Sequence, residues 1–237
     1  MKWANTVQLG PLPRLLEEER GRLVNPFAAW DPGRGRLVFG QGTFDEARPS
    51  GTRAEVYTAT PIGTKLQVRE IRPSGDRPAP RHGSCGAYVH APERGLDGVL
   101  VVGGQSAGSG GDSLSEVWWL DFAEREAGTW HDVTPRVANQ GAFGPRREGA
   151  CAYDAASETF YWWMGRATRD IPDGAKRSSG AWRLSLADLG DAGAALSWER
   201  LAPDDLDGVT GRHEIPSVWD PVGRRMLAIG GRYDDDA

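Results

Sequence analysis

The chain has 237 residues and a formal net charge of −5, with 39% hydrophobic and 26% charged residues. The acidic balance argues against a nucleic-acid-binding surface, and no stretch approaches the roughly 18 apolar residues of a membrane span. The first residues lack the apolar core of a secretory signal, so we expect a cytoplasmic protein. In that compartment we expect Cys85 and Cys151, the two cysteines, to be small buried side chains rather than a disulfide.

The first predicted strand covers residues 3–9, and its tryptophan, threonine and valine are typical of an outer strand of a sheet. A unit of four predicted strands follows over approximately residues 22–71. Its apolar runs are bounded by Gly, Pro, Asp and Ser, which indicates short antiparallel strands joined by turns. We name the four strands of such a unit a, b, c and d in chain order.

Two further units, 80–134 and 145–201, repeat this order, and a fourth, 211–231, contains strands a and b alone. Self-similarity at a fixed period indicates a repeat architecture, so we treat residues 1–237 as one repeat region. A glycine that permits a turn with positive φ follows each strand b. These glycines are Gly40, Gly104, Gly165 and Gly231. The second and fourth units carry a double glycine there, and the first and third carry degenerate versions.

The second unit shows the pattern most fully. Its strand b ends in Gly103-Gly104, its strand c contains Trp118 and Trp119, and its strand d contains Trp130. Apolar runs ending in Gly-Gly, followed by aromatic strands, resemble the kelch family of β-propellers over almost the whole chain. The resemblance implies an all-β fold, a kelch-like β-propeller of about four four-stranded antiparallel blades. A β-sandwich is the alternative, but sandwiches do not repeat a four-strand unit in register.

The predicted strands are too few to complete every blade of such a closed ring. Propellers commonly close by letting an N-terminal strand complete the last blade, and residues 3–9 look like that contribution, but the fourth unit supplies no strand c beside it. Three arrangements therefore stay open, since exposed blade edges must be covered. The chain is part of a larger propeller, or half of a ring completed by another copy or a different chain, or a compact four-bladed ring with one three-stranded blade.

The two rims of the repeat differ in their loops. The a–b turns are short, and we interpret Asp31, Asp154 and Asp220 in them as structural turn residues. The long b–c and d–a segments lie together on the opposite rim, because strands alternate in direction. We expect function on that rim, where the loops are long and variable.

That rim carries a repeated basic position at the entry to strand a. The two aligned sets are Arg81, Arg146 and Arg212, and, one residue later, His82, Arg147 and His213. The kelch resemblance implies that these residues bind acidic peptides, as in kelch adaptors of ubiquitin ligases, since guanidinium groups suit carboxylates. The alternative is that the arginines brace the d–a segments or pair with Glu148 and Glu214.

We expect no metal site and no cofactor. Zinc needs three or more converging ligands, and His82 and His213 belong to units two blades apart. The chain also lacks a Gly-x-Ser-x-Gly elbow, a His-Glu-x-x-His motif and a phosphate-binding loop that opens a helix.

The function that we expect is therefore a non-catalytic protein-interaction or scaffold module, which binds a protein or peptide partner through the b–c and d–a rim. One alternative is a structural subunit that completes a propeller with another chain, as a homo- or hetero-oligomer. The other alternative is a kelch-type sugar or small-molecule enzyme with its site at the central channel.

Overall fold

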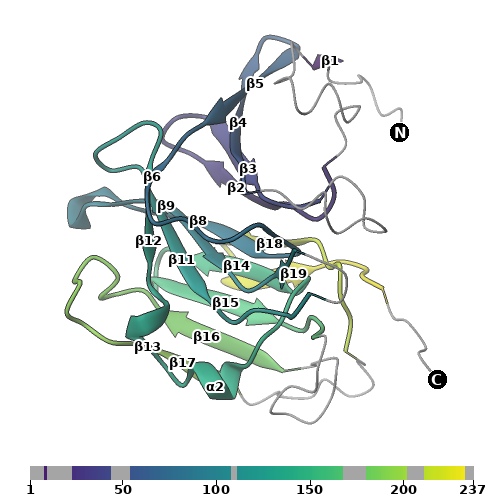
Figure 1. Ribbon diagram of the computed structural model, residues 1–237, viewed down its shortest axis with the longest axis vertical. Helices are drawn as coiled ribbons and strands as arrows, with labels where there is room; N and C mark the ends of the chain where they lie inside the picture. Colours follow the sequence, from purple (N-terminus) through teal and green to yellow (C-terminus); the bar gives the residue numbers. More distant parts are fainter. Residues whose placement is uncertain are drawn as a thin grey trace.

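The computed structural model describes residues 8–9, 23–43, 54–107, 111–167, 180–201 and 211–232. Over these residues the chain is all-β and forms successive antiparallel sheets, in the order of the sequence units (Figure 1). None of the helices in these ranges has the length and apolar character needed to cross a membrane.

The first sheet shows how each unit is built. Strands β2 (Phe27–Asp31), β3 (Arg36–Gly40), β4 (Val56–Ile62) and β5 (Lys65–Ile71) pair antiparallel with their chain neighbours. In β2 the side chains alternate between buried and exposed, which is the pattern of a strand with one face in a core. The predicted order a, b, c, d is confirmed here.

The second and third sheets repeat this arrangement, and the fourth contains two described strands. The second sheet consists of β8 (Cys85–Ala91), β9 (Leu96–Val102), β11 (Val117–Asp121) and β12 (Thr129–Asp132). The third consists of β14 (Ala150–Asp154), β15 (Thr159–Trp163), β16 (Ala181–Ser185) and β17 (Leu196–Leu201). The fourth is the hairpin of β18 (Ser217–Asp220) and β19 (Arg225–Ala228).

Smaller elements connect the sheets. Strands β7 (Arg81–His82) and β10 (Gln105–Ser106) form a two-stranded ladder. The short helix α2 (Gln140–Phe143) precedes the third sheet. Single 3₁₀ turns occupy Pro92–Arg94 and Thr134–Arg136.

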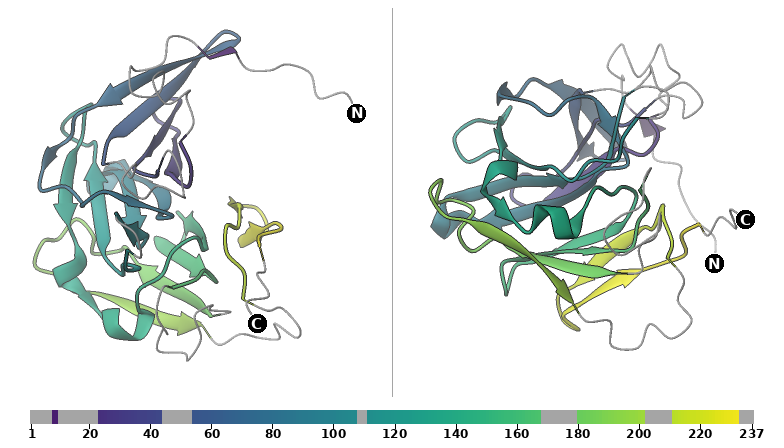
Figure 2. Two further views of the ribbon diagram at one scale, coloured as in Figure 1. Left: turned by 45° about the vertical axis from the view of Figure 1, so that its right-hand side comes forward. Right: turned by 60° about the horizontal axis from the view of Figure 1, so that its bottom comes forward.

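The inner strands of the four sheets lie side by side. Strand β8 contacts both β2 and β14, and β14 in turn contacts β18 (Figure 2). The largest core lies between the second and third sheets, where Phe143 of α2 stacks on Trp198 with ring centres 4.0 Å apart. Between the described residues, no backbone-to-backbone hydrogen bond joins the fourth sheet to the first. The fold is thus a row of sheets packed through their inner strands.

Each of the first three sheets carries one additional short strand on its outer edge. Strand β1 (Gln8–Leu9) pairs in parallel with β5, β6 (Ser74–Gly75) pairs with β12, and β13 (Val137–Ala138) pairs with β17. The prediction that residues 3–9 complete the last unit is therefore wrong for Gln8 and Leu9, and residues 3–7 lie outside the described ranges. The physical reason is that each segment leading into a sheet first runs along that sheet's outer strand.

Cys85 and Cys151 form a disulfide, so the expectation of two separate thiols is wrong. Cys85 begins β8 and Cys151 lies in β14, and these neighbouring inner strands hold the two Cα atoms 6.1 Å apart. That separation lies within the usual range for a disulfide. The expectation depended on an assumed compartment, whereas the pairing follows from the packing of the two inner strands.

Two consecutive residues with positive φ follow strand b in every unit. The four pairs are Gln41-Gly42, Gly103-Gly104, Met164-Gly165 and Gly230-Gly231. Gly42, rather than Gly40, is therefore the equivalent of the later glycines, and the degenerate units keep the same backbone conformation. The second glycine donates its N–H to the next unit, from Gly42 to the Arg81 carbonyl (2.7 Å) and from Gly104 to the Arg146 carbonyl (3.0 Å).

The a–b turns bear out the structural interpretation of their aspartates. Asp31 accepts a hydrogen bond from the Arg34 N–H, Asp154 from the Ala156 N–H, and Asp220 from the Gly223 N–H. These are turns in which an aspartate side chain caps its own backbone. Hydrogen bonds from Ser157 and Ala156 lower the pKa of Asp154, although burial alone would raise it.

Candidate functional site

Four residues with left-handed backbone conformation form a chain of hydrogen bonds at the entries to the inner strands. They are Asn25, Gly83, Glu148 and Glu214. Gly83 donates its N–H to the Asn25 carbonyl (2.8 Å), Glu148 to Gly83 (2.7 Å), and Glu214 to Glu148 (2.8 Å). The same repeat position in all four units is thus linked across the sheets.

These four residues border a cavity of about 340 Å³ between the inner strands. Its walls include Phe27 of β2, the Cys85–Cys151 disulfide and Ser217 of β18, so every sheet contributes to it. The cavity occupies the place at which the kelch resemblance implies a central channel. Its charged residues are Glu148 and Glu214.

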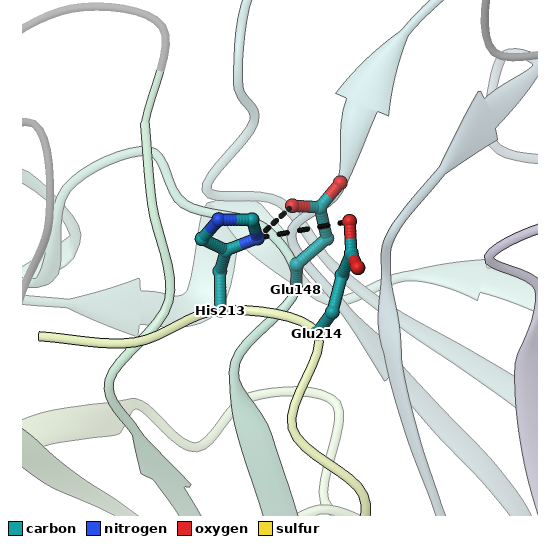
Figure 3. A group of neighbouring side chains, drawn as sticks. All are labelled: Glu148, His213 and Glu214. Carbon is teal, nitrogen blue, oxygen red and sulfur yellow. Dashed lines mark ion pairs between the residues drawn. The ribbon is translucent and has the colours of Figure 1, made fainter. Parts of the chain in front are cut away.

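A histidine joins the two glutamates in one cluster (Figure 3). His213 is fully buried, and its Nδ1 lies 3.3 Å from Glu148 Oε2 and 3.7 Å from Glu214 Oε1. The three residues come from two different units, which the hydrogen bond between the Glu214 and Glu148 backbones brings together. Sequence reasoning compared His213 only with His82, its equivalent in a unit two blades apart, and considered the glutamates only as partners of arginines.

Arginines surround the same carboxylates. Arg147 donates to Glu148 Oε1 (2.9 Å), and Arg166 Nε donates to Glu148 Oε2 (2.5 Å). Arg232 donates to Glu214 Oε1 (3.4 Å). Three guanidinium groups thus accompany two carboxylates in this cluster.

The cluster has donor atoms that a metal ion accepts, because one ligand atom from each of Glu148, His213 and Glu214 lies within 4.8 Å of the others. A histidine and two carboxylates are suitable zinc ligands. However, both carboxylates are engaged by arginine, and an ion would have to displace those charge-assisted hydrogen bonds. We therefore assign no metal to it.

The alignment of the predicted basic positions is confirmed by the backbone. The carbonyls of Arg81, Arg146 and Arg212 each accept a hydrogen bond from the glycine of the preceding unit. The three arginines are thus equivalent, as the repeat predicts.

Two of these arginine side chains are enclosed. Arg81 donates to the Gly103 carbonyl (3.3 Å) and pairs with Glu116. Arg146 donates to the Phe143 carbonyl, and its guanidinium lies 4.3 Å from the centre of the Phe143 ring. Both side chains brace the entry to strand a, which is the alternative that the sequence left open.

The other four predicted binding residues differ in how far they are exposed to solvent. His213 is buried, whereas His82, Arg147 and Arg212 are half-buried and reach the surface. Peptide binding at this rim remains a prediction, and the half-buried side chains are the ones that can contact a partner. Arg166 and Arg232 lie beside them but were not predicted, because they sit in b–c segments whose path the repeat does not fix.

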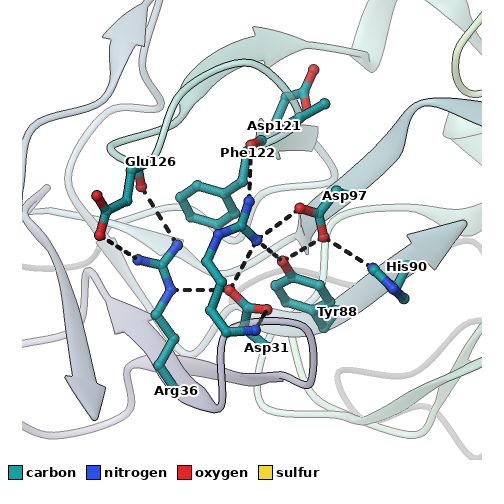
Figure 4. A network of polar contacts seen from close by, with 10 residues as sticks. Asp31, Arg36, Tyr88, His90, Asp97, Asp121, Phe122 and Glu126 are labelled. Atoms are coloured by element: carbon teal, nitrogen blue, oxygen red, sulfur yellow. Dashed lines mark hydrogen bonds and ion pairs between the residues drawn. The ribbon is translucent and has the colours of Figure 1, made fainter. Parts of the chain in front are cut away.

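A second polar network lies on the opposite rim, between the first and second sheets (Figure 4). Arg34 pairs with Asp31 (3.2 Å) and Asp97 (2.7 Å), and Tyr88 donates to Asp97 (2.8 Å). Burial alone would raise the pKa of Asp97, but hydrogen bonds from Tyr88, Arg34 and His90 hold it below its usual value. Burial and the neighbouring Asp97 raise the pKa of Tyr88. Sequence reasoning missed this network because its arginines belong to a turn of generic appearance.

Comparisons with known proteins show a similarity of fold to solved structures. No family model matches the chain, and no curated protein matches it in sequence. It is similar to a chain of a solved structure described as the cryo-EM structure of RAG in complex with one melted RSS and one unmelted RSS. The TM-score is 0.57 at 17% identity, and the similarity covers 82% of this chain and 55% of that one. The chain thus spans about half the length of that neighbour, and the likeness concerns the fold alone.

Proposed function

We propose that the chain forms part of a kelch-like β-propeller and acts as a non-catalytic module that binds an acidic segment of a partner protein. Three observations support the propeller: the four-strand sheets in repeated order, the adjacent inner strands, and the hydrogen bonds that repeat between sheets. The observation that carries the binding proposal is the group of arginines around the cavity. Arg147 and Arg166 pair with Glu148, and Arg232 pairs with Glu214, so three guanidinium groups accompany the two carboxylates of the cavity wall.

The proposal predicts that removal of two arginine charges that reach the surface weakens binding of an acidic peptide. In the variant Arg212→Ala/Arg232→Ala, we expect the affinity for a fluorescent hexaglutamate peptide to fall at least tenfold, about 1.4 kcal/mol, as measured by fluorescence polarisation. Arg232 is largely exposed and pairs weakly with Glu214, so the fold should survive. Added salt should weaken binding to the parent chain.

The matched control removes the same number of charges elsewhere. Lys65 of β5 and Arg200 of β17 are exposed on outer strands, so Lys65→Ala/Arg200→Ala should leave the affinity unchanged. A hexaglutamine peptide should not bind. Equal affinity of both double variants for hexaglutamate would contradict the arginine proposal.

A second candidate function, a subunit whose sheet is completed by another copy, is favoured by the fourth sheet. Val218, Leu227 and Ile229 have exposed fractions of 56%, 38% and 71%. The positions equivalent to Val218 and Leu227 in the first sheet, Ala29 and Val38, are buried. Among the described strands, β19 has no strand c beside it. Two β19 edges related by a two-fold axis are able to pair antiparallel.

This second candidate predicts a dimer in solution. Light scattering behind size exclusion should give twice the chain mass, and Leu227→Lys should shift the protein toward the monomer, because it places like charges at the paired edge. The control Val222→Lys alters an exposed turn residue outside the strands and should leave the mass unchanged. A monomeric parent chain at every concentration would rule out pairing between copies.

A further inference from the structure

A large polar cavity lies on the rim opposite to the arginine-rich site. It has a volume of about 630 Å³ and is enclosed by the first sheet, the a–b turn of the first unit and the c–d turn of the second. The first sheet contributes Thr58 and Thr60 of β4 and Gln67 and Arg69 of β5. The turn that follows β11 contributes residues 122–126.

The cavity exists because one repeat position carries different residues in the first and second sheets. Thr58 and Trp119 are both the third residue of their strand c, and they pair with Val38 and Leu100. In the second sheet the Trp119 ring lies across Gly98 and fills the apolar space toward the third sheet. In the first sheet the short Thr58 stands in place of the tryptophan. The space between the second and third sheets is therefore filled by apolar side chains, whereas the equivalent space between the first and second sheets is a polar cavity.

Arg36 provides a buried positive group at the end of this cavity. Its side chain is 5% exposed, and its Nε donates to Asp31 Oδ2 at 3.0 Å. Its Nη2 donates to the Glu126 carbonyl at 3.4 Å, and the ring of Phe122 lies 4.9 Å from the guanidinium. Arg36 is thus fixed in position by contacts with three residues.

The Nη1 of Arg36 has a longer contact. It faces the carboxylate of Glu126 at 3.8 Å, beyond hydrogen-bond distance, and the Glu126 side chain is 86% exposed (Figure 4). A solvated carboxylate of the chain itself therefore already approaches this edge of the guanidinium. A carboxylate held closer would gain a charge-assisted hydrogen bond that Glu126 does not make.

The opposite wall offers neutral polar groups and one further cation. Thr58 pairs with Arg69 and Thr60 with Gln67, so their side chains share one face of the sheet. Two hydroxyls, an amide and an exposed guanidinium thus face the space in front of Arg36. Such groups hydrogen-bond with hydroxyl substituents, and Arg69 adds attraction for an anion.

We propose that this cavity binds a small hydroxyl-bearing carboxylate of the sugar-acid class, with the carboxylate on Arg36 Nη1 and the hydroxyls along β4 and β5. The site is separate from the proposed peptide site, since the two lie on opposite rims and share no residue. Glu126 competes with the ligand for Arg36 and so limits its affinity.

The test is isothermal titration of the full chain with gluconate, with sorbitol as the matched probe that keeps the hydroxyls and lacks the carboxylate. We expect gluconate to bind and sorbitol not to bind. Glu126→Gln should strengthen gluconate binding severalfold, because it removes the competing charge. Arg69→Met should weaken it at least fivefold, whereas Arg200→Met, an exposed arginine of the third sheet, should have no effect.

Three results would overturn the proposal. If sorbitol bound as tightly as gluconate, the carboxylate would not contribute to recognition of the ligand. Gluconate binding that is equal in the parent chain, Glu126→Gln and Arg69→Met would place the ligand elsewhere. Absence of gluconate binding at millimolar concentrations in both the parent chain and Glu126→Gln would show that the cavity does not serve this class of ligand. Arg36 is left intact in every variant, so none of these results depends on a loss of folding.

Discussion

Reduction of the Cys85–Cys151 disulfide should lower the free energy of unfolding by about 4 kcal/mol, the loop-closure contribution expected for a cross-link between cysteines this far apart in the chain. The bridge spans 66 residues and joins the inner strands of the second and third sheets. Its loss leaves the folded contacts largely in place but gives the unfolded chain more freedom. Urea unfolding followed by tryptophan fluorescence, with and without a phosphine reductant, measures the difference.

A cysteine-free variant separates the bridge from other effects of the reductant. Cys85→Ala/Cys151→Ala should unfold at the same urea concentration as the reduced parent chain, and the reductant should not change it further. Both cysteines lie in the wall of the cavity between the inner strands, so small side chains are accommodated there. An oxidised parent chain that unfolds at the same midpoint as the variant would contradict a stabilising bridge.

The second large effect concerns the left-handed glycine after strand b. Gly104→Ala should cost about 3 kcal/mol, because a side chain at φ +103° is strained and a Cβ there would lie 3.0 Å from the His82 carbonyl oxygen as well as 2.3 Å from Ser84 Oγ. The backbone would have to move, and the hydrogen bond from Gly104 to Arg146 would weaken with it. Urea unfolding of the oxidised chain measures the cost.

Gly35→Ala is the matched control for this substitution. Gly35 also has positive φ, at +60°, but nothing lies within 4 Å of a Cβ built there. It should cost only about 1 kcal/mol, the penalty of the left-handed conformation itself. Equal costs for the two variants would show that the crowding around Gly104 and its hydrogen bond to Arg146 contribute nothing.

The strands and turns were predictable from the sequence because their signals are local. A short apolar run bounded by Pro26 and Asp31 marks β2, and Asp31 and Asp154 cap turns that lie within a few residues of them. The equivalence of Arg81 and Arg146 was also predictable, since a repeat preserves its register. A closed or completed ring stays a prediction, because the described strands leave the fourth sheet at two.

Features that depend on contacts between units were not predictable. The burial of Arg146 depends on Phe143 of α2, and the cluster at His213 depends on Glu148 of the preceding unit. One local signal was available: Glu148 and Glu214 follow the aligned basic residues at the same repeat position. The cavity beside Arg36 required a comparison of sheets residue by residue, because threonine in a strand carries no signal of its own.

The short outer strands β1, β6 and β13 bear on how the molecule unfolds. The segments that enter the second and third sheets are held in two places. At the outer edge, β6 or β13 pairs with the last strand of the sheet. At the inner strand, the carbonyl of Arg81 or Arg146 accepts a hydrogen bond from the glycine of the preceding unit. A sheet fastened to its neighbours at both places cannot detach without breaking contacts in the adjacent unit. The unit that unfolds cooperatively is therefore larger than a single sheet. The amide hydrogens of the second and third sheets should lose their protection from hydrogen exchange together.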